Sequence, residues 1–452
     1  MKKAVLLAMI LLAFTVVLTA TASPETVSVI IQASDVETAV ALAQRHGGKV
    51  DERLAIINGV SAELSTRQLA QLSADPQLVR VHRESRVSAA FDDIVTAPPA
   101  PPNTYFPEQV GAPRVWQQGI TGSGVGVAVV DTGIGVDSSF LAARYDALDY
   151  SLSPYDAHGH GTLMASLIAN PLQDNNGYIS IAPGVDLIDV RVMGADGSGT
   201  YADILEGLDW ILANHATYNI QVVNLSLVAG PNEPYWDNPI NQAVEALWEA
   251  GIVVVTAAGN AGPEALTISV PGNDPFVITV GSITDNHTPA DPADDYIPPF
   301  SGAGPTETGF IKPDVLAPGT NLVAVVRPTT TWAIENPEQR IYGPFYRISG
   351  TSASTAVTSG VVALMRQANP QLTPDEIKYA LMDAARPAVD AEGLAWSVYQ
   401  QGAGRVWAPH AVLNPAAGEA NGGMLIGEPH LGPVIFRDEY FRLVDEASND
   451  LP

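Results

Sequence analysis

The sequence predicts an α/β protein in which an open parallel sheet carries helices on both faces, preceded by a small α+β domain. Two patterns predict the sheet. Short runs rich in Val and Ile, typical of strands buried on both faces, alternate with longer segments of helical periodicity. The apolar runs lie near residues 125–130, 187–193, 220–227, 251–257 and 276–281. The helical segments lie near residues 161–169, 202–215, 238–250, 353–368 and 374–385.

The chain begins with the features of a bacterial secretory signal peptide. Lys2 and Lys3 give a basic start, residues 4–20 are apolar, and Ala20-Thr21-Ala22 offers small residues for cleavage. We therefore expect residues 1–22 to be removed on export to the periplasm or the medium, with no stable membrane insertion afterwards. The alternative is an uncleaved membrane anchor, although the apolar stretch is short for a spanning helix.

Residues 23–103 predict a small domain and a linker. Strand and helix patterns follow one another in the order βαββαβ, which is ferredoxin-like. They cover residues 27–31, 35–46, 50–57, 60–64, 66–73 and 78–82. The Pro-rich run at residues 97–102 predicts an exposed, polyproline-like tether.

Composition excludes several functions. The chain has 452 residues, 46% of them hydrophobic, which is enough for two or three folding units. Because there is no Cys, a disulfide framework, a thiol nucleophile and a cysteine metal site are excluded. The net charge of −27 repels nucleic acid, so we expect no nucleic-acid partner. Residues 415–452 end in a cluster of acids and predict a mostly exposed tail, or the start of an accessory region.

A serine stands at the beginning of the helical segment 353–368, in the run Gly350-Thr351-Ser352. At a helix N-terminus its hydroxyl lies among unpaired N–H groups and the positive end of the helix dipole. Such a position stabilises negative charge that develops on an acyl group. The alternative for this tripeptide alone is an ordinary N-cap serine.

Two further motifs carry an acid and a base. Asp131 ends the apolar run 125–130, and the carboxyl end of a parallel strand is where α/β active sites form. The run His158-Gly159-His160-Gly161-Thr162 opens the next helical segment. The chain order Asp, His, Ser is one of those in which Ser-His-Asp triads occur. Taken alone, Asp131 would be an ordinary turn residue.

These motifs resemble those of the subtilisin-like serine proteases. Four more segments carry the resemblance in the family's order: residues 190–201, 224–227, 253–260 and 313–319. It implies a doubly wound, subtilisin-like catalytic domain over residues 104–414. It also implies a secreted serine endopeptidase that acts on proteins or peptides through an acyl-enzyme.

The resemblance also assigns catalytic roles. Ser352 is the nucleophile, and His160, which directly precedes Gly-Thr, is the base that Asp131 orients. Asn260 would donate to the oxyanion together with the Ser352 N–H. His158 remains an alternative base, and Asn260 could be a simple turn residue. The chemistry requires no cofactor.

The substrate would bind as an extended strand between two edges of the enzyme. The resemblance places on these edges Gly197, Ser198, Gly199, Ser226, Leu227 and Val228. It assigns Ala257, Ala258 and Gly259 to the walls of the first specificity pocket, and it places Ser269 near the base of that pocket. No acidic residue aligns in this pocket, so we expect an apolar residue on the amino side of the cut bond.

The family also carries a propeptide of the predicted βαββαβ kind, which inhibits the enzyme until it is removed. We therefore expect residues 23–103 to be a propeptide, cut in or near the Pro-rich linker, and the enzyme to be a monomer. An unrelated small domain is the alternative.

Asp174 and Asn176 lie where the family has a calcium loop, so a structural Ca²⁺ is a candidate, although an ordinary turn fits the same residues.

The chain departs from the family pattern at several positions. Leu163 and Thr355 stand where a histidine and a proline are common, and Val228 replaces a glycine of the substrate edge. Residues 326–346 look inserted ahead of the nucleophile. None of these removes a catalytic group, which argues against an inactive homologue. The glycines of residues 122–126 precede a strand and lack a Gly-Lys-Ser/Thr motif, which argues against nucleotide binding.

Overall fold

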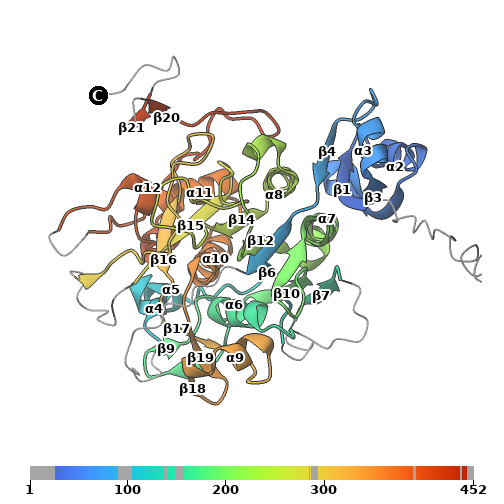
Figure 1. Ribbon diagram of the computed structural model, residues 1–452. Helices are drawn as coiled ribbons and strands as arrows, with labels where there is room; N and C mark the ends of the chain where they lie inside the picture. The colour runs from blue at the N-terminus through green and yellow to red at the C-terminus, as the bar shows by residue number, and fades with distance from the viewer. Residues whose placement is uncertain are drawn as a thin grey trace, which may run out of the picture.

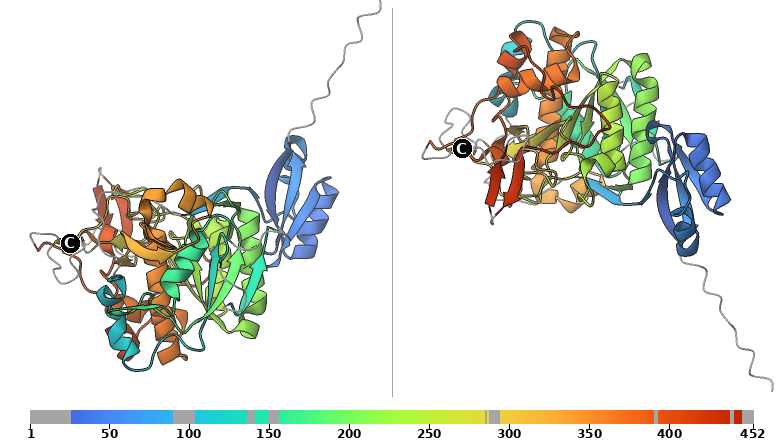
Figure 2. Two further views of the ribbon diagram at one scale, coloured as in Figure 1. Left: turned by 90° about the horizontal axis from the view of Figure 1, so that it is seen from below. Right: turned by 90° about the horizontal axis from the view of Figure 1, so that it is seen from above.

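The structure is a computed structural model and describes residues 26–89, 104–135, 141–148, 156–284, 286, 294–389, 393–437 and 440–444. A small N-terminal domain lies at one side of a large α/β domain (Figures 1 and 2). The predicted signal peptide and the Pro-rich linker fall outside the described residues. Within the described part of the chain, no helix is long and apolar enough to cross a membrane.

The N-terminal domain has the predicted βαββαβ order. Its elements are β1 (Thr26–Gln32), α2 (Val36–Arg45), β2 (Lys49–Leu54), the 3₁₀ turn η1 (Ala55–Ile57), β3 (Gly59–Ser65), α3 (Thr66–Leu72) and β4 (Arg80–Arg83). The antiparallel sheet has the order β2-β3-β1-β4. Asp35 and Ser65 cap the two helices by accepting from the N–H groups of Thr38 and Gln68. The ferredoxin-like prediction is therefore confirmed.

The large domain contains a seven-stranded parallel sheet with the order β16-β15-β14-β12-β6-β10-β7. Its strands are β6 (Gly126–Asp131), β7 (Ala143–Asp146), β10 (Asp186–Arg191), β12 (Ile220–Leu225), β14 (Val253–Ala257), β15 (Ile278–Ile283) and β16 (Val315–Pro318). The five central strands were predicted, which confirms the α/β class. The two edge strands were not, because β7 is polar and partly exposed and β16 resembles a turn.

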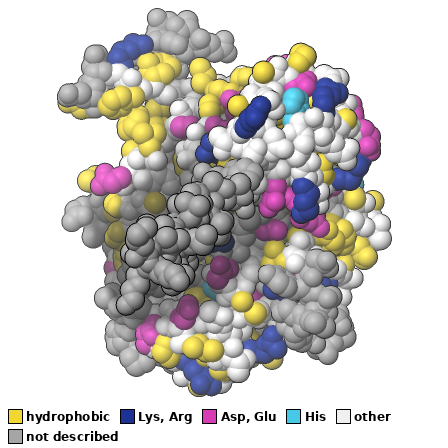
Figure 3. All heavy atoms as spheres, turned by 45° about the vertical axis from the view of Figure 1, so that its right-hand side comes forward, with side chains coloured by type: hydrophobic (Ala, Val, Ile, Leu, Met, Phe, Trp, Pro, Cys, Tyr) yellow, Lys and Arg dark blue, Asp and Glu magenta, His cyan; other side chains and the backbone are white. Residues whose placement is uncertain are grey.

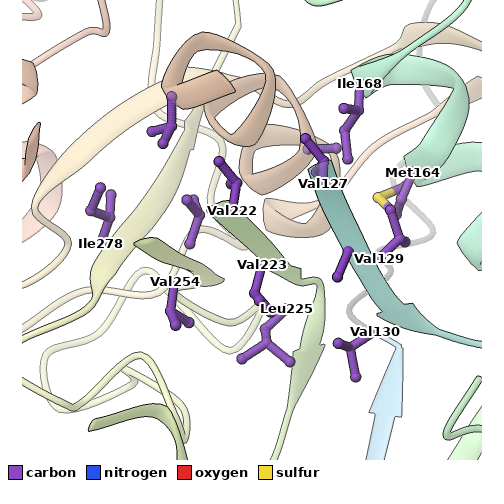
Figure 4. Packing of buried hydrophobic residues seen from close by; sticks show 14 of the residues in the cluster. Val127, Val129, Val130, Met164, Ile168, Val222, Val223, Leu225, Val254 and Ile278 are labelled. Carbon is purple, nitrogen blue, oxygen red and sulfur yellow. The ribbon is translucent and has the colours of Figure 1, made fainter. Parts of the chain in front are cut away.

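Helices cover both faces of this sheet, as predicted. The main ones are α6 (His160–Ile168), α7 (Tyr201–Tyr218), α8 (Pro239–Glu249), α10 (Thr351–Ala368) and α11 (Pro374–Asp383). Helices α7 and α8 pack on one face, whereas α6 and α10 pack on the other. Figure 4 shows the core between them, to which the adjacent strands β6 and β12 contribute Val127 and Val222, and β15 contributes Ile278. Helix α10 is buried from Thr351 to Arg366, so Ser352 sits on a rigid element.

Short elements complete the domain. The helical ones are α4 (Phe106–Gln109), α5 (Ala112–Trp116), η3 (Tyr235–Asp237), α9 (Thr331–Glu335), η5 (Pro337–Gln339), α12 (Val398–Gln401) and α13 (Ala408–Leu413). Strands β17 (Leu322–Val325), β18 (Arg340–Tyr342) and β19 (Phe345–Ile348) form a small sheet in the order β17-β19-β18. The segment 326–346 comprises α9, η5, β18 and the first residues of β19. It pairs with β17 and folds as a compact unit.

One three-stranded sheet joins the two domains. Strand β5 (Arg86–Ala89), which follows the N-terminal domain, lies between β11 (Ser198–Thr200) and β13 (Leu227–Val228) of the large domain. Both pairings are antiparallel. The N-terminal domain also packs through β2 and η1 against α7 and α8. The predicted substrate edges therefore hold a strand of the chain itself.

Gly427 and His430 tie the segment 415–437 to the large domain. Most side chains of residues 415–437 are partly or largely exposed. However, the Gly427 N–H donates to Glu245 Oε2 at 2.9 Å, and the His430 N–H donates to the Tyr235 hydroxyl at 3.1 Å. The hairpin β20 (Val434–Arg437) and β21 (Tyr440–Leu443) follows. The acidic cluster that ends the chain lies outside the described residues, so the prediction of an exposed tail or accessory region stays a prediction. In Figure 3, acidic side chains lie among basic and apolar ones.

Candidate active site

Two elements bring the predicted acid and base together, and a third, α10, packs against α6 and carries the serine. Asp131 is the last residue of β6, His160 the first of α6 and Ser352 the second of α10, and all three side chains are buried. His160 Nδ1 lies 2.7 Å from Asp131 Oδ1 and 2.8 Å from Oδ2. An Nδ1–H proton donated to this carboxylate leaves Nε2 as the basic nitrogen of the neutral ring. The arrangement suits a general base.

The serine is fixed by its neighbours on the substrate edge. Ser352 Oγ lies 3.1 Å from the carbonyl oxygen of Ser226, and Ser226 Oγ lies 3.0 Å from the carbonyl oxygen of Ser352. These two contacts tie the first turn of α10 to the residue before β13. Ser352 and the predicted substrate edge are therefore held in one register.

Asn260 has the geometry of an oxyanion donor. Its Oδ1 accepts hydrogen bonds from the Thr351 N–H at 3.0 Å and from Thr351 Oγ1 at 2.8 Å. These bonds determine which end of the amide is the nitrogen. Nδ2 is buried and has no acceptor among the described residues. A buried donor without an acceptor costs about 1–3 kcal/mol, which a transition-state oxygen would recover. The Ser352 N–H, in the first turn of α10, is a second donor.

The two predicted substrate edges flank β5. Ser88 is the central partner, because it lies opposite Ser198 on one side and opposite Val228 on the other. Ala89 lies opposite Leu227, and its N–H donates to the carbonyl of Gly197 at 3.1 Å. This is the geometry expected of an extended peptide bound between the edges.

The residues predicted for the first pocket are also adjacent. Ala257 and Ala258 are fully buried at the end of β14. Gly259 has φ 102°, and a Cβ there would lie 2.2 Å from Ser269 Oγ, so only glycine fits. The Ser269 N–H donates to the carbonyl of Ala258 at 2.9 Å. None of the four carries a charge, which suits an apolar ligand.

His158 is a poor alternative base. Its ring lies 6.5 Å from that of His160, and it is His160 that contacts Asp131. Burial lowers the pKa of His158 and favours its neutral form. A Cβ at Gly197 would lie 2.7 Å from His158 Nε2, so His158 lies against the substrate edge. We therefore assign it to the wall of the cleft.

The segment 326–346 supports the histidine loop. The Thr331 N–H donates to the carbonyl of Ala157 at 3.0 Å, and the Trp332 N–H donates to the carbonyl of His158 at 2.9 Å. Trp332 packs edge-on against Tyr346 in a buried contact. The segment therefore holds the loop that precedes His160.

Asp156, which lies four residues before His160, was not predicted from the sequence. Its side chain is 1% exposed and accepts hydrogen bonds from Thr132, Gly159 and Thr162, all close in sequence to Asp131 or His160. An acid just before a helical segment that begins with glycines is a recognisable capping signal. Its link to Thr132 spans 24 residues and could not be read from the local pattern.

The calcium prediction is not supported by the geometry. Asp174 Oδ2 accepts from the N–H and hydroxyl of Thr104, and Oδ1 accepts from the N–H of Asn176. Both oxygens are thus engaged by protein donors in a turn between β8 (Gln173–Asp174) and β9 (Gly177–Tyr178). In the described part of the chain, no three acidic or histidine side chains group as metal ligands. The ordinary-turn alternative fits these residues better.

The other departures have structural explanations. Leu163 is buried in the core beside α10, and Thr355 Oγ1 donates within α10 to the carbonyl of Thr351 at 2.8 Å. The glycine-rich turn before β6 is occupied by the protein itself, since Gln367 Oε1 accepts from the N–H groups of Thr121, Gly122 and Ser123. These N–H groups are therefore not available to a phosphate.

Comparison with known proteins identifies the family of this chain. Residues 122–404 match the subtilase family. The chain is 36% identical over 376 residues to "Serine protease AprX" of Bacillus subtilis (strain 168), covering 80% of this chain and 81% of that protein. It is 30% identical over 344 residues to "Subtilisin E" of the same strain, covering 75% of this chain and 78% of the relative.

A solved structure shows the same fold. The crystal structure of fervidolysin from Fervidobacterium pennivorans, a keratinolytic enzyme related to subtilisin, aligns with a TM-score of 0.66 at 20% identity. The alignment covers 87% of this chain and 62% of fervidolysin. The family match spans more than half of the sequence and contains Asp131, His160, Asn260 and Ser352. The chain therefore belongs to the subtilase family and is a serine endopeptidase.

Proposed function

We propose that this enzyme is a secreted bacterial endopeptidase, made as a zymogen, that cuts peptide bonds with Ser352, His160 and Asp131. The observation that carries the proposal is the contact of His160 Nδ1 with both oxygens of Asp131, 2.7 and 2.8 Å away. A carboxylate in this position fixes the ring and stabilises the imidazolium that forms during attack.

The residues suit acyl transfer in two steps. Ser352 Oγ attacks the peptide carbonyl carbon as its proton passes to His160 Nε2, and the carbonyl oxygen becomes an oxyanion. Asn260 Nδ2 and the Ser352 N–H donate to that oxygen. The His160 proton then passes to the leaving amine, the C–N bond breaks and an acyl-enzyme remains. Water then attacks the acyl-enzyme in the same way, with His160 again accepting and returning the proton, and the carboxylic acid product leaves Ser352. Members of the subtilase family need no cofactor for this chemistry.

Labelling with a fluorophosphonate tests the activity. The probe reacts only with an activated serine, so the mature enzyme should be labelled and Ser352→Ala should not. An inactive homologue that serves as a binding module would leave the folded wild-type protein unlabelled. A peptide-library digest, read by mass spectrometry, then tests the expected apolar residue on the amino side of the cut.

We infer that the N-terminal domain is the enzyme's own propeptide and inhibitor. The pairing of β5 with both substrate edges supports this, because a peptide in that position excludes substrate. Contacts away from the cleft support it too: Gln32 Nε2 donates to Gln242 Oε1 at 2.7 Å, and Arg80 Nη1 donates to the carbonyl of Trp236 at 2.9 Å.

Secretion and the monomeric state belong to the same proposal. The basic and apolar character of residues 1–22 supports export. Mass spectrometry of the protein found outside the cell should detect no peptide from these residues. Light scattering during size-exclusion chromatography should give the mass of one chain.

A further inference from the structure

The carboxylate of Asp156 is a hydrogen-bonding hub beside the catalytic pair. Oδ1 accepts from Thr132 Oγ1 at 2.8 Å and from the Gly159 N–H at 2.6 Å. Oδ2 accepts from the Thr162 N–H at 2.9 Å and from Thr162 Oγ1 at 2.7 Å. Four donors thus converge on one buried carboxylate. Such charge-assisted bonds are stronger than neutral ones.

The donors come from both sides of the catalytic pair. Thr132 directly follows Asp131 at the end of β6, whereas Gly159 and Thr162 stand on either side of His160. Thr132 closes a ring, because its Oγ1 also accepts from the Gly161 N–H at 3.0 Å. Asp156 and Thr132 together therefore link the end of β6 to the first turn of α6. These are the two elements whose separation sets the Asp131–His160 distance.

We propose that Asp156 is a positioning residue for peptide-bond hydrolysis, which holds Asp131 and His160 in hydrogen-bonding contact by bridging β6 to the start of α6. The inference rests on the proposed triad and names a further residue on which that triad depends. A shift of about 1 Å in a catalytic contact can reduce the rate roughly a hundredfold. The bridge therefore has a measurable consequence in catalysis as well as in stability.

Two changes weaken the bridge from opposite ends. Asp156→Asn replaces one acceptor oxygen by an NH₂ group, which faces two existing donors. Thr132→Val removes the hydroxyl that joins Asp156 to Gly161 at nearly constant volume, and Thr132→Ser restores that hydroxyl. The matched control is Asp314→Asn. Asp314 is another buried carboxylate, which accepts from the Thr279 N–H at 2.7 Å and from Lys312 Nζ at 2.6 Å.

The test compares kcat, KM and thermal stability of these enzymes after maturation has gone to completion. We expect Asp156→Asn and Thr132→Val to lower kcat roughly ten- to a hundredfold with KM within about twofold, and Thr132→Ser to recover most of the loss. Asp314→Asn should lower the melting temperature and leave kcat near the wild-type value. The low-field proton resonance of the His160 Nδ1–H should shift or broaden in Asp156→Asn and Thr132→Val, and should stay unchanged in Asp314→Asn.

The outcomes separate this proposal from the proposed function. Wild-type kcat in folded Asp156→Asn and Thr132→Val would overturn the positioning role, and so would an equal loss of kcat in Asp314→Asn. Neither result would affect the triad, which is tested separately by loss of fluorophosphonate labelling in Ser352→Ala. If Asp156→Asn does not fold, the pair Thr132→Val and Thr132→Ser decides the question.

Discussion

The backbone N–H of Ala89 donates a hydrogen bond to the carbonyl oxygen of Gly197, 3.1 Å away, so the chain's own strand β5 is bound along a substrate edge of the enzyme. Ala89 is also the partner of Leu227 on the opposite edge. The next residue of that edge is Ser226, whose carbonyl oxygen lies 3.1 Å from Ser352 Oγ. This register connects the N-terminal domain to the nucleophile.

The register predicts the bond that the enzyme cuts in itself. A peptide that continues the antiparallel pairing Ala89–Leu227 by one residue would reach Ser226, so we expect cleavage after Ala90, before the Pro-rich linker begins. Mass spectrometry of the newly matured enzyme should show Phe91 as the first residue. A first cut within residues 97–102, where the linker composition alone would place it, would contradict this register.

The separated N-terminal domain should inhibit the mature enzyme competitively. Residues 23–90 supplied in trans would occupy the same edges as substrate, so inhibition at micromolar levels should be relieved by raising the substrate concentration. The matched control is residues 23–83, which lack β5 and should inhibit far more weakly. Non-competitive inhibition, or equal inhibition by both fragments, would reject docking in the cleft.

Inhibition should weaken as pH rises. Burial, followed by the nearby Glu206, Asp203 and Glu84, raises the pKa of Glu52 from its ordinary 4.5 to about 8. Tyr145 adds to the group, since its hydroxyl donates to Glu206. Between pH 4.5 and about pH 8, Glu52 is therefore protonated in the docked state and ionised in the separated domain. The free energy of docking that this proton contributes is lost as the pH rises through that range. Because Glu52 is only about half buried, we expect a change in Ki of roughly ten- to a hundredfold between pH 5.5 and pH 8.5.

A single substitution tests this cause. Glu52→Gln keeps the shape of the side chain and removes its titration, so the Ki of the variant domain should vary much less over the same pH range. Inhibition measured at each pH against the same mature enzyme gives the comparison. A wild-type Ki that is constant from pH 5.5 to pH 8.5 would show that Glu52 does not titrate on docking.

Asn260→Ala should lower kcat roughly a hundred- to a thousandfold with little change in KM, the loss typical of an oxyanion donor. The reason is that Nδ2 is buried without an acceptor among the described residues, so its donation is reserved for the transition state. Thr351→Val, which removes only the hydroxyl bond to Oδ1, should have a smaller effect. Steady-state kinetics on a peptide substrate measure both, and a loss confined to KM would assign Asn260 to ground-state binding.

The sequence was sufficient where the signal is local. Asp131 and His160 each stand at the boundary of an apolar strand or helix, so their motifs predicted the contact that the two side chains make. Distant pairings were less accessible. The strands that pair with β5 lie more than a hundred residues beyond it, and the sequence of residues 86–89 does not indicate which strands these are.

The overlooked features have the same origin. Asp156 looks like a turn residue until Thr132 is brought to it from the end of β6. The four residues of β16 have no strand pattern of their own, and they are a strand because they pair with β15. The turn at Asp174 depends on Thr104, at the other end of a 70-residue separation, which the local asparagine-rich sequence does not reveal.

Maturation of the purified Ser352→Ala precursor is the most direct test of the central claim, that Ser352 is the nucleophile which also cuts its own N-terminal domain. With no other protease present, the wild-type precursor should convert to the mature enzyme, whereas Ser352→Ala should stay at full length and bind no fluorophosphonate. Conversion of Ser352→Ala at the wild-type rate under these conditions would contradict the account.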